Sequence, residues 1–507
     1  MIVVLDFGSQ YSQLIARKIR QLNVYTEIVP YNIGLSELRA RKPEGIVLSG
    51  GPANIYAPGA PRLNKKILEL GVPVLGICYG MQAITVATGG KVDHSEKREF
   101  GHAVVRCAGG AKEPFWQGLD AEQKVWMSHQ DRVAKLPEDY KIIGETPTCP
   151  AAMRHSKLPI YGVQFHPEVH HTKHGNQILK NFVLGICGCK ADWRMRDFVD
   201  RTIEEIREYV GDRRVVCAVS GGVDSTVLAV LLHRALGKKL IPVFVDNGVL
   251  RLNEVEVVKQ RFAEVGIDIK VSRSASKFLK ALKGVSDPEK KRKIIGRTFI
   301  EVFFQYLKPT DLLAQGTLYP DVIESVSTKG PSATIKTHHN RVKEVLDLIK
   351  EGRVVEPLKE LFKDEVREVG KALGLSKELL WRHPFPGPGL AIRILGEVTP
   401  KRLEILRQAD AIYIDELKKA GEYYNVWQGF SVLLPVKAVG VMGDERTYEH
   451  VLALRAVESV DGMTADWCKL PYEVLGRVSN RIINEIRGIN RVVYDVSSKP
   501  PSTIEWE

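Results

Sequence analysis

The chain has 507 residues, 44% apolar and 26% charged, and its 73 basic against 61 acidic residues give a net charge of +12. This composition is typical of folded globular proteins and excludes collagen-like, disordered and coiled-coil chains, while the length predicts about three domains. No apolar run approaches the roughly 20 residues of a membrane span, the start lacks the features of a signal peptide, and seven scattered cysteines do not suggest a disulfide framework, so we expect a cytoplasmic protein.

The first part of the chain alternates apolar runs with helical spacing. Residues 2–5, 45–48 and 72–77 are apolar runs of strand length, and residues 10–20 have the spacing of a helix. Strands that alternate with helices indicate a parallel sheet covered on both faces. We therefore predict a doubly wound α/β domain over residues 1–190.

A second α/β pattern begins near Asp192. A helical stretch to Tyr209 precedes the apolar run 214–219, and a further helix and strand follow at 226–236 and 240–245. The stretch 383–389, His-Pro-Phe-Pro-Gly-Pro-Gly, cannot be helical. We predict a second doubly wound domain over 191–383 and a small C-terminal α+β domain over 384–507.

A candidate nucleophile lies in the first domain. Cys78 follows a buried strand and precedes a helical stretch, with Gly76 and Gly80 two residues to either side. Such glycines allow a sharp strand-to-helix elbow, and the helix start favours a thiolate and an oxyanion. The alternative is a buried structural cysteine.

A second segment supports the catalytic interpretation. His166 and Glu168 are two residues apart at the end of an apolar run that starts at Tyr161, so in an extended strand they would point the same way. Cys78, His166 and Glu168 would then supply the nucleophile, base and orienting carboxylate of acyl transfer.

These segments, Gly-Ile-Cys-Tyr-Gly-Met-Gln and Phe-His-Pro-Glu-Val, resemble the class I glutamine amidotransferases. The resemblance implies a flavodoxin-like fold and release of ammonia from glutamine through a γ-glutamyl thioester on Cys78. It also implies an oxyanion and glutamine-binding set formed by Gly50, Gly51, Tyr79, Gln82, Ser128, His129 and Asp131.

A phosphate-binding loop is indicated between the strand ending at Val219 and the next helix. Glycines let main-chain N–H groups approach phosphate oxygens, and the helix start favours anions. Asp224 suggests a Mg²⁺ ligand, because Mg²⁺ usually takes one or two carboxylates with phosphate oxygens. The loop lacks the Walker lysine, and its residues are Ser220, Gly221, Gly222, Val223, Asp224, Ser225 and Thr226.

Ser-Gly-Gly-Val-Asp-Ser resembles the pyrophosphate loop of the N-type ATP pyrophosphatases, which cleave ATP between its α and β phosphates. This resemblance implies a Rossmann-like domain with Mg²⁺ and ATP. Phe244 and Val245, at the end of the next strand, are expected near the adenine and ribose, although both residues suit a hydrophobic core equally well.

Taken together, the two motifs and the ending Lys-Pro-Pro-Ser-Thr-Ile-Glu-Trp-Glu resemble the family of glutamine-hydrolysing GMP synthetases over nearly the whole chain. The resemblance implies that Mg-ATP adenylates xanthosine 5′-monophosphate (XMP) and that ammonia displaces AMP to give GMP. The residues implied for XMP or phosphate binding are Arg292, Lys499, Thr503, Ile504 and Glu505.

The segment 316–340 is rich in Gly, Pro, Ser and Thr and suits a lid over the phosphates. The family resemblance places Lys336 on phosphate charge and Asp321 and Glu324 near the acceptor. Residues 341–345 depart from the family pattern and look helical. The basic run 290–293 by itself favours a solvated face.

Two other functions remain open at this stage. Another ATP pyrophosphatase, such as an NAD synthetase or a tRNA-thiolating enzyme, would share the loop, but the predicted ATP domain contains only Cys217 to carry sulfur. A catalytically silent regulatory homologue would share the fold. We expect glutamine, ATP and XMP as substrates, no nucleic-acid or membrane partner, and a homodimer as the family resemblance implies.

Overall fold

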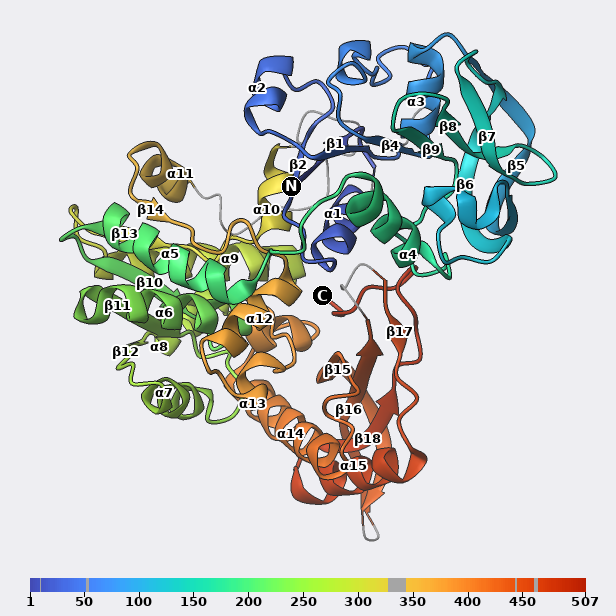
Figure 1. Ribbon diagram of the computed structural model, residues 1–507. Coiled ribbons are helices and arrows are strands. Elements are labelled where there is room, and N and C mark those ends of the chain that lie inside the picture. The colour runs from blue at the N-terminus through green and yellow to red at the C-terminus, as the bar shows by residue number, and fades with distance from the viewer. Residues whose placement is uncertain (10, 52–53, 327–342, 443–444, 460–463) are drawn as a thin grey trace. The chain divides into compact units, whose positions relative to one another are not determined.

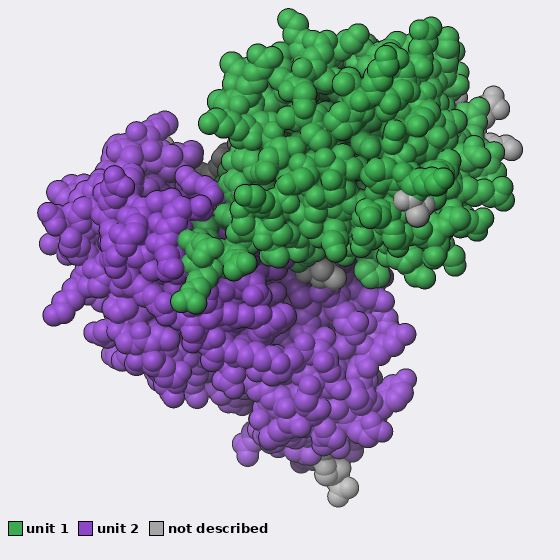
Figure 2. Space-filling view, viewed as in Figure 1, with its two compact units in different colours: residues 1–198, 319–335 green, residues 199–318, 336–507 purple. Residues whose placement is uncertain are grey.

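The computed structural model of the chain describes residues 1–9, 11–51, 54–326, 343–442, 445–459 and 464–507. The chain divides into two units (Figure 2): Met1–Phe198 with Tyr319–Ile335, and Val199–Leu318 with Lys336–Glu507. Residues 384–507 belong to the second unit, so the three-domain division stays a prediction. None of the helices in the described ranges has the length and apolar character that a membrane span requires.

Unit 1 is built on a nine-stranded sheet within the described residues, in the order β2-β1-β3-β4-β9-β8-β7-β5-β6. Its first five strands are parallel and buried on both faces, as their continuous apolar sequences predict. They are β1 (Ile2–Asp6), β2 (Thr26–Pro30), β3 (Gly45–Leu48), β4 (Val74–Ile77) and β9 (Ile160–Val163).

The other half of this sheet is antiparallel, which the prediction of a parallel sheet did not include. Short connections join β7, β8 and β9, and such connections allow only antiparallel neighbours. The four strands are β5 (Lys91–Cys107), β6 (Glu122–Lys135), β7 (Tyr140–Glu145) and β8 (Pro150–His155).

Helices cover both faces of the parallel half, as the prediction of a doubly wound fold requires. Figure 1 shows α1 and α4 on one side of the sheet and α2 and α3 on the other. The bounds are α1 (Ser12–Arg20), α2 (Leu35–Ala40), α3 (Tyr79–Ala87) and α4 (Gly175–Lys180).

A fifth helix of unit 1, α10 (Tyr319–Val326), comes from the segment predicted to be a lid. Its Tyr319 hydroxyl bonds to the main-chain N–H of Ile28, and the Arg20 guanidinium lies 4.9 Å from the Tyr319 ring centroid. The start of the predicted lid is therefore helical and anchored to β2 and α1.

Unit 2 contains a five-stranded parallel sheet in the order β12-β11-β10-β13-β14 within the described residues. This confirms the second α/β pattern, and helix α6 packs on β10 and β11. The strands are β10 (Val215–Val219), β11 (Leu240–Asp246), β12 (Lys270–Arg273), β13 (Leu312–Ala314) and β14 (Val354–Val355). The helices of this segment are α5 (Met195–Val210), α6 (Val223–Leu236), α7 (Glu254–Glu264), α8 (Ala275–Leu282), α9 (Pro288–Phe303), α11 (Lys343–Lys350), α12 (Lys363–Ala372) and α13 (Lys377–Leu380).

The C-terminal segment is α+β, as predicted. Strand β16 (Glu445–Glu458) pairs antiparallel with β15 (Gln428–Met442) and β17 (Asp466–Trp467) and parallel with β18 (Ile489–Tyr494). Helices α14 (Pro400–Lys419) and α15 (Tyr472–Glu485) pack against this sheet. One hydrophobic cluster contains residues of this segment and of β10 and β11, which explains why the segment does not form a separate unit.

The join between β4 and α3 depends on two small residues. A Cβ atom at Gly76 would lie 2.5 Å from the Gly80 carbonyl carbon, and one at Gly80 would overlap the carbonyl oxygen of Leu48 in β3. Helix α3 can therefore approach the sheet only because both side chains are absent. The glycines provide space here, whereas Cys78 between them takes the positive φ.

Gly80→Ala is expected to destabilise unit 1 by about 3 kcal/mol, because the overlapping atom is rigid main chain. Hydrogen–deuterium exchange of peptides from α3 would measure the loss as faster exchange. Gly185→Ala is the matched control, since a Cβ atom there would meet nothing within 4 Å. Equal exchange in the two variants would contradict the packing argument.

Candidate active sites

Cys78 is held in a backbone conformation that few residues adopt. It lies between β4 and α3 with φ 51° and ψ −104°, a region that costs a non-glycine residue on the order of 1–3 kcal/mol. Its main-chain N–H donates to the Val163 carbonyl at 2.7 Å. The elbow thus places the thiol at the N-terminus of α3, where helix N–H groups favour a thiolate.

His166 and Glu168 are joined as predicted, but not by a strand. His166 Nδ1 lies 2.7 Å from Glu168 Oε1, and both side chains are buried. Strand β9 ends at Val163, so the expected strand alternation was wrong. A turn brings the pair together instead: the Thr172 hydroxyl donates to the His166 carbonyl at 2.6 Å, and His166 N–H donates to the Trp126 carbonyl.

The electrostatics of this pair favour a charged imidazole. Burial opposes protonation of His166, but the Glu168 carboxylate and the Cys78 sulfur outweigh it and raise the pKa of His166 well above its usual value. An imidazolium beside a thiol stabilises the thiolate. The three residues therefore have the contacts of a thiol nucleophile, its acid–base partner and an orienting carboxylate.

The predicted oxyanion loop lies against this triad. A Cβ atom at Gly50 would be 3.4 Å from His166 Cε1, and one at Gly51 would be 3.0 Å from the Phe7 carbonyl oxygen. The Ser49 hydroxyl donates to the Gly50 carbonyl at 2.9 Å. A larger residue at Gly50 would crowd the His166 ring, and one at Gly51 would crowd the Phe7 main chain and the Tyr79 ring.

The predicted glutamine-binding residues Ser128, His129 and Asp131 lie within strand β6, not in a turn, and the strand brings them to the thiol. The Ser128 carbonyl lies 3.9 Å from Cys78 Sγ. Gln82 Nε2 and His129 Nδ1 both donate to the Asp131 carbonyl, at 3.0 and 3.1 Å. Gln82 therefore supports this part of β6 through the Asp131 main chain.

The Tyr79 ring lies beside Gly51, where a Cβ atom would be 3.1 Å from the ring, but the Tyr79 hydroxyl is bonded away from the triad. This hydroxyl donates to the Pro61 carbonyl at 2.6 Å, and burial raises the pKa of Tyr79 to about 12. Tyr79 is thus placed to act through its main-chain N–H, next to the nucleophile.

In unit 2 the loop between β10 and α6 has the features expected of a phosphate site. Gly221 has φ +71°, and α6 starts at Val223. The Ser225 hydroxyl accepts from the Ser220 N–H at 3.1 Å, and the Thr226 hydroxyl donates to the Gly222 carbonyl at 2.8 Å. These bonds preform the loop at the start of a fourteen-residue helix, where anions are favoured.

Asp224 has a partner that the sequence analysis missed. Lys363, at the first position of α12, lies 2.6 Å from Asp224 Oδ2, whereas Asp224 Oδ1 is buried without a hydrogen bond. The sequence does show a lysine at the start of a helix that follows the short strand β14, and this was the only indication of a cation here. Its separation of 139 residues from the loop hid the pairing.

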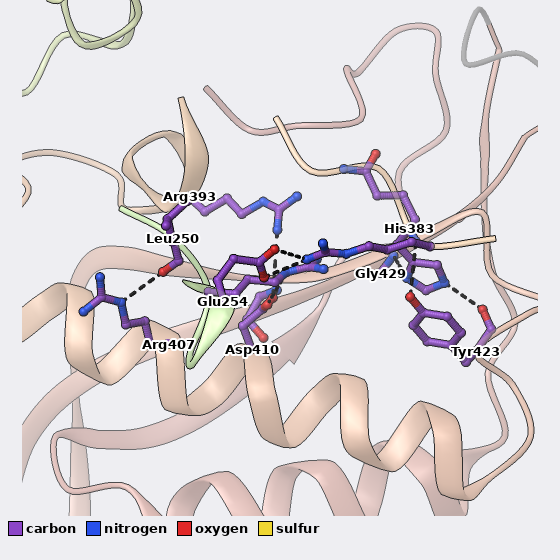
Figure 3. A network of polar contacts seen from close by, with 12 residues as sticks. Leu250, Glu254, His383, Arg393, Arg407, Asp410, Tyr423 and Gly429 are labelled. Atoms are coloured by element: carbon purple, nitrogen blue, oxygen red, sulfur yellow. Dashed lines mark hydrogen bonds and ion pairs between the residues drawn. The ribbon is translucent and has the colours of Figure 1, made fainter. Parts of the chain in front are cut away.

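Arg382 fixes the phosphate loop from the other side. Its Nη1 donates to the Gly221 carbonyl at 2.9 Å, and its Nη2 contacts both carboxylate oxygens of Glu254 at 2.5 and 2.7 Å. The next residue, His383, links two segments of the C-terminal part of the chain (Figure 3). It donates to the Tyr423 carbonyl and accepts from the Gly429 N–H. Burial lowers the pKa of His383 to about 4, so this bridge is neutral.

Phe244 and Val245 lie just before the last residue of β11, Asp246, and are 1% and 5% exposed. Val245 belongs to the main hydrophobic core of unit 2. The structure therefore favours the hydrophobic core over a nucleotide contact for these two side chains. Only their main chain remains available to contact a nucleotide.

The C-terminal residues lie against α9. Arg292 donates to the main-chain oxygen of Glu507, and Lys291 contacts the Glu507 carboxylate and the Ala391 and Ile394 carbonyls. Lys291 is fully buried, so the expectation of a solvated basic face was wrong at this position. Helix periodicity turns Lys291 inward, where three oxygen groups satisfy its ammonium.

The tail residues predicted to bind XMP occupy different environments. Ile504 is buried against Phe430 and Val432, and Glu505 pairs with Arg393. Thr503 is exposed, and the Lys499 main chain pairs with Ala465. Arg292 and the tail are thus brought together within unit 2.

The predicted lid residues are placed only in part. Asp321 and Glu324 lie on α10, which belongs to unit 1 rather than to the unit that carries the phosphate loop. Lys336 lies outside the described residues. Over those residues, no group of three or more His, Cys, Asp or Glu side chains is arranged to hold a metal ion by itself.

Comparison with known proteins gives consistent results along the chain. Residues 3–186 match the model of the class-I glutamine amidotransferase family, and residues 415–506 match the GMP synthase C-terminal domain. Proteins called GMP synthase [glutamine-hydrolyzing] from Aquifex aeolicus and Nitratidesulfovibrio vulgaris are each 57% identical to the chain, and one from Chlorobium phaeovibrioides is 56% identical. Each alignment covers 100% of this chain and 99% of the relative.

Glu168→Gln is expected to lower the pKa of His166, because burial then acts without the opposing carboxylate. Less imidazolium at neutral pH means less Cys78 thiolate, so iodoacetamide should alkylate Cys78 at pH 7 about tenfold more slowly or worse. Mass spectrometry across a pH series would measure the rate. Cys107, whose pKa burial raises to about 11, serves as the internal control; an unchanged Cys78 profile would contradict the assignment.

Proposed function

The chain belongs to the family of glutamine-hydrolysing GMP synthases, and from this premise we propose which of its residues carry the two half-reactions. The protein is a ligase that makes GMP with glutamine as the nitrogen donor. The observation that carries the residue assignment is the pairing of a buried Cys78, His166 and Glu168 triad in one unit with a preformed phosphate loop in the other.

Unit 1 releases ammonia from glutamine. The Cys78 thiolate attacks the side-chain carbonyl carbon of glutamine, and the negative oxygen is stabilised by N–H groups of the Gly50–Gly51 loop and of Tyr79. His166 gives its proton to the leaving nitrogen, which departs as ammonia and leaves a γ-glutamyl thioester. His166 then takes a proton from water, which attacks the thioester and regenerates the thiolate with glutamate as product.

The glutamine itself is held by the part of strand β6 that contains Ser128, His129 and Asp131. The position of the Ser128 carbonyl near Cys78 Sγ supports this assignment, as does the support that Gln82 gives to Asp131.

Unit 2 activates the acceptor. An oxygen of XMP attacks the α-phosphorus of ATP, the bond to the β-phosphate breaks, and pyrophosphate leaves. Ammonia then displaces AMP from the activated carbon to give GMP. The loop Ser220–Thr226 binds the phosphates that depart, and Lys363 adds a positive charge beside Asp224.

The loop also fits a magnesium ion. Asp224 has one buried oxygen without a hydrogen bond, and a single carboxylate with phosphate oxygens is a common Mg²⁺ ligand set. When bound, Mg²⁺ supplies positive charge to the phosphate oxygens. The main chain at Phe244 and Val245 contacts the adenosine.

XMP binds at the C-terminal residues of unit 2. The proposed contacts are Arg292, Lys499, Thr503, Ile504 and Glu505, and the bond between Arg292 and the Glu507 main chain supports this grouping. As the family resemblance implies, Asp321 and Glu324 are proposed to act on the acceptor and Lys336 on the phosphates.

Variants of the two sites are expected to lose different activities. Cys78→Ala should abolish GMP formation from glutamine but keep formation from ammonium salt, and Asp224→Ala should abolish both while keeping glutaminase activity. Chromatography of reactions with XMP and Mg-ATP would measure GMP, AMP and pyrophosphate, which the wild type should form in equal amounts. AMP without GMP would indicate another acceptor, as in an NAD synthetase-like enzyme. No ATP cleavage by the wild type would favour a catalytically silent homologue.

We also propose that the protein is a cytoplasmic homodimer that meets its second copy through β15 and β16. The apolar side chains Val439, Val441 and Tyr448 are 48%, 73% and 63% exposed on these paired strands. Exposed apolar patches of this kind mark interaction surfaces.

A double change, Val439→Lys with Val441→Lys, is expected to halve the mass that analytical ultracentrifugation measures, because two charges would be buried without partners. Val104→Lys, at an exposed valine of β5, is the control and should leave the mass unchanged. A wild-type monomer, or a variant dimer, would contradict the assignment.

A further inference from the structure

Arg393 is a charged residue that no step of the mechanism uses. It ends the short 3₁₀ helix Gly389–Arg393, and its side chain is fully buried. Its Nε donates to Glu505 Oε2 at 3.1 Å and its Nη2 to Glu505 Oε1 at 2.8 Å. A buried guanidinium is costly without such a bidentate partner, so the two groups fix one another's orientation.

Gln428 contributes a third donor to the same carboxylate. Its Nε2 lies 2.7 Å from Glu505 Oε1, and its side chain is buried at the start of β15. A carboxylate has about four acceptor positions, and three are now taken. The Glu505 side chain is 17% exposed, so little more than one acceptor position remains for a ligand.

The surroundings of Arg393 require a planar cation. Its guanidinium carbon lies 4.1 Å from the Phe430 ring centroid and 5.3 Å from that of Phe385. Asp410 lies 3.9 Å away and also pairs with Arg251 (Figure 3). A lysine has neither the flat faces nor the two parallel N–H groups that this position uses.

The tail has contacts other than those with Arg393 that fix its path. Arg455 donates to the carbonyls of Ser497 and Thr503, at 2.5 and 3.3 Å. Ile504 is buried against Phe430, and the Trp506 indole donates to Asp495 at 2.9 Å. Arg393 and Gln428 therefore act on the Glu505 side chain rather than on the fold of the tail.

We propose that Arg393 and Gln428 are positioning residues that aim one acceptor position of Glu505 at the nucleotide acceptor, an inference that rests on the proposed function. A carboxylate can only accept, so the ligand group that it meets is a hydroxyl or a ring N–H. The positive charge of Arg393 balances the Glu505 carboxylate, so that an anionic nucleotide can bind beside it without strong repulsion.

The test compares Arg393→Lys and Gln428→Met with the wild-type full-length protein, using ammonium salt as the nitrogen donor. Arg393→Lys should raise the KM for XMP about tenfold, and Gln428→Met about threefold, both within the net contribution of one ordinary hydrogen bond. The KM for ATP should stay within about twofold in both, because the phosphate loop has its own supports. Arg477→Lys is the matched control, since Arg477 pairs with Glu416 away from the tail.

An unchanged KM for XMP in folded Arg393→Lys would overturn the proposal, and so would parallel increases in the KM for both substrates, which indicate a structural role. Circular dichroism establishes folding. If Arg393→Lys does not fold, the test rests on Gln428→Met, in which an uncharged side chain replaces another of similar size. The KM values for XMP and ATP are then compared in the same way. A wild type that makes no GMP from XMP would overturn the proposed function itself, a result visible before any variant is measured.

Discussion

Each functional segment of this chain is fixed by a charged group that has been removed from water. Glu168, Arg393, Lys291 and Arg455 are all fully buried, and each is matched by an oppositely charged group or by main-chain oxygens. Removing a charge from water costs several kcal/mol unless a partner is held in good geometry. These pairs therefore add little net stability, but they allow only a narrow range of side-chain positions.

The two sites use this constraint in different ways. In unit 1 one carboxylate acts on one imidazole, outweighs the effect of burial and raises the pKa of that imidazole. In unit 2 the buried pairs hold main chain: Arg382 holds the Gly221 carbonyl and Arg455 holds the tail. The first arrangement sets a protonation state, whereas the second sets the shape of surfaces that receive phosphates and a nucleotide.

Much of this could be predicted from the sequence because its signals are local. Apolar runs such as residues 2–5 gave the parallel strands, and the elbow at Cys78 and the loop at Ser220 are short motifs beside such strands. The pairings of Lys363, Arg382 and Arg393 could not be predicted. Their partners lie more than 100 residues away, and one sequence contains no signal for such contacts.

Two local expectations also failed for physical reasons. The basic run around Lys291 was read as solvated, but helix periodicity places one of its residues inside, where carbonyl oxygens replace water. Strand alternation was invoked for His166 and Glu168, although the strand ends at Val163 and a turn produces the same contact. In both cases the residue types indicated the right kind of contact, but the backbone conformation assumed for them was wrong.

The backbone of Cys78 places that position under opposing demands. A positive φ costs any residue with a side chain, and glycine alone would remove the cost. Selection for stability would thus favour glycine there, and only the need for a thiol keeps a side chain in place. A descendant of this fold that no longer used glutamine would therefore gain stability by replacing Cys78 with glycine.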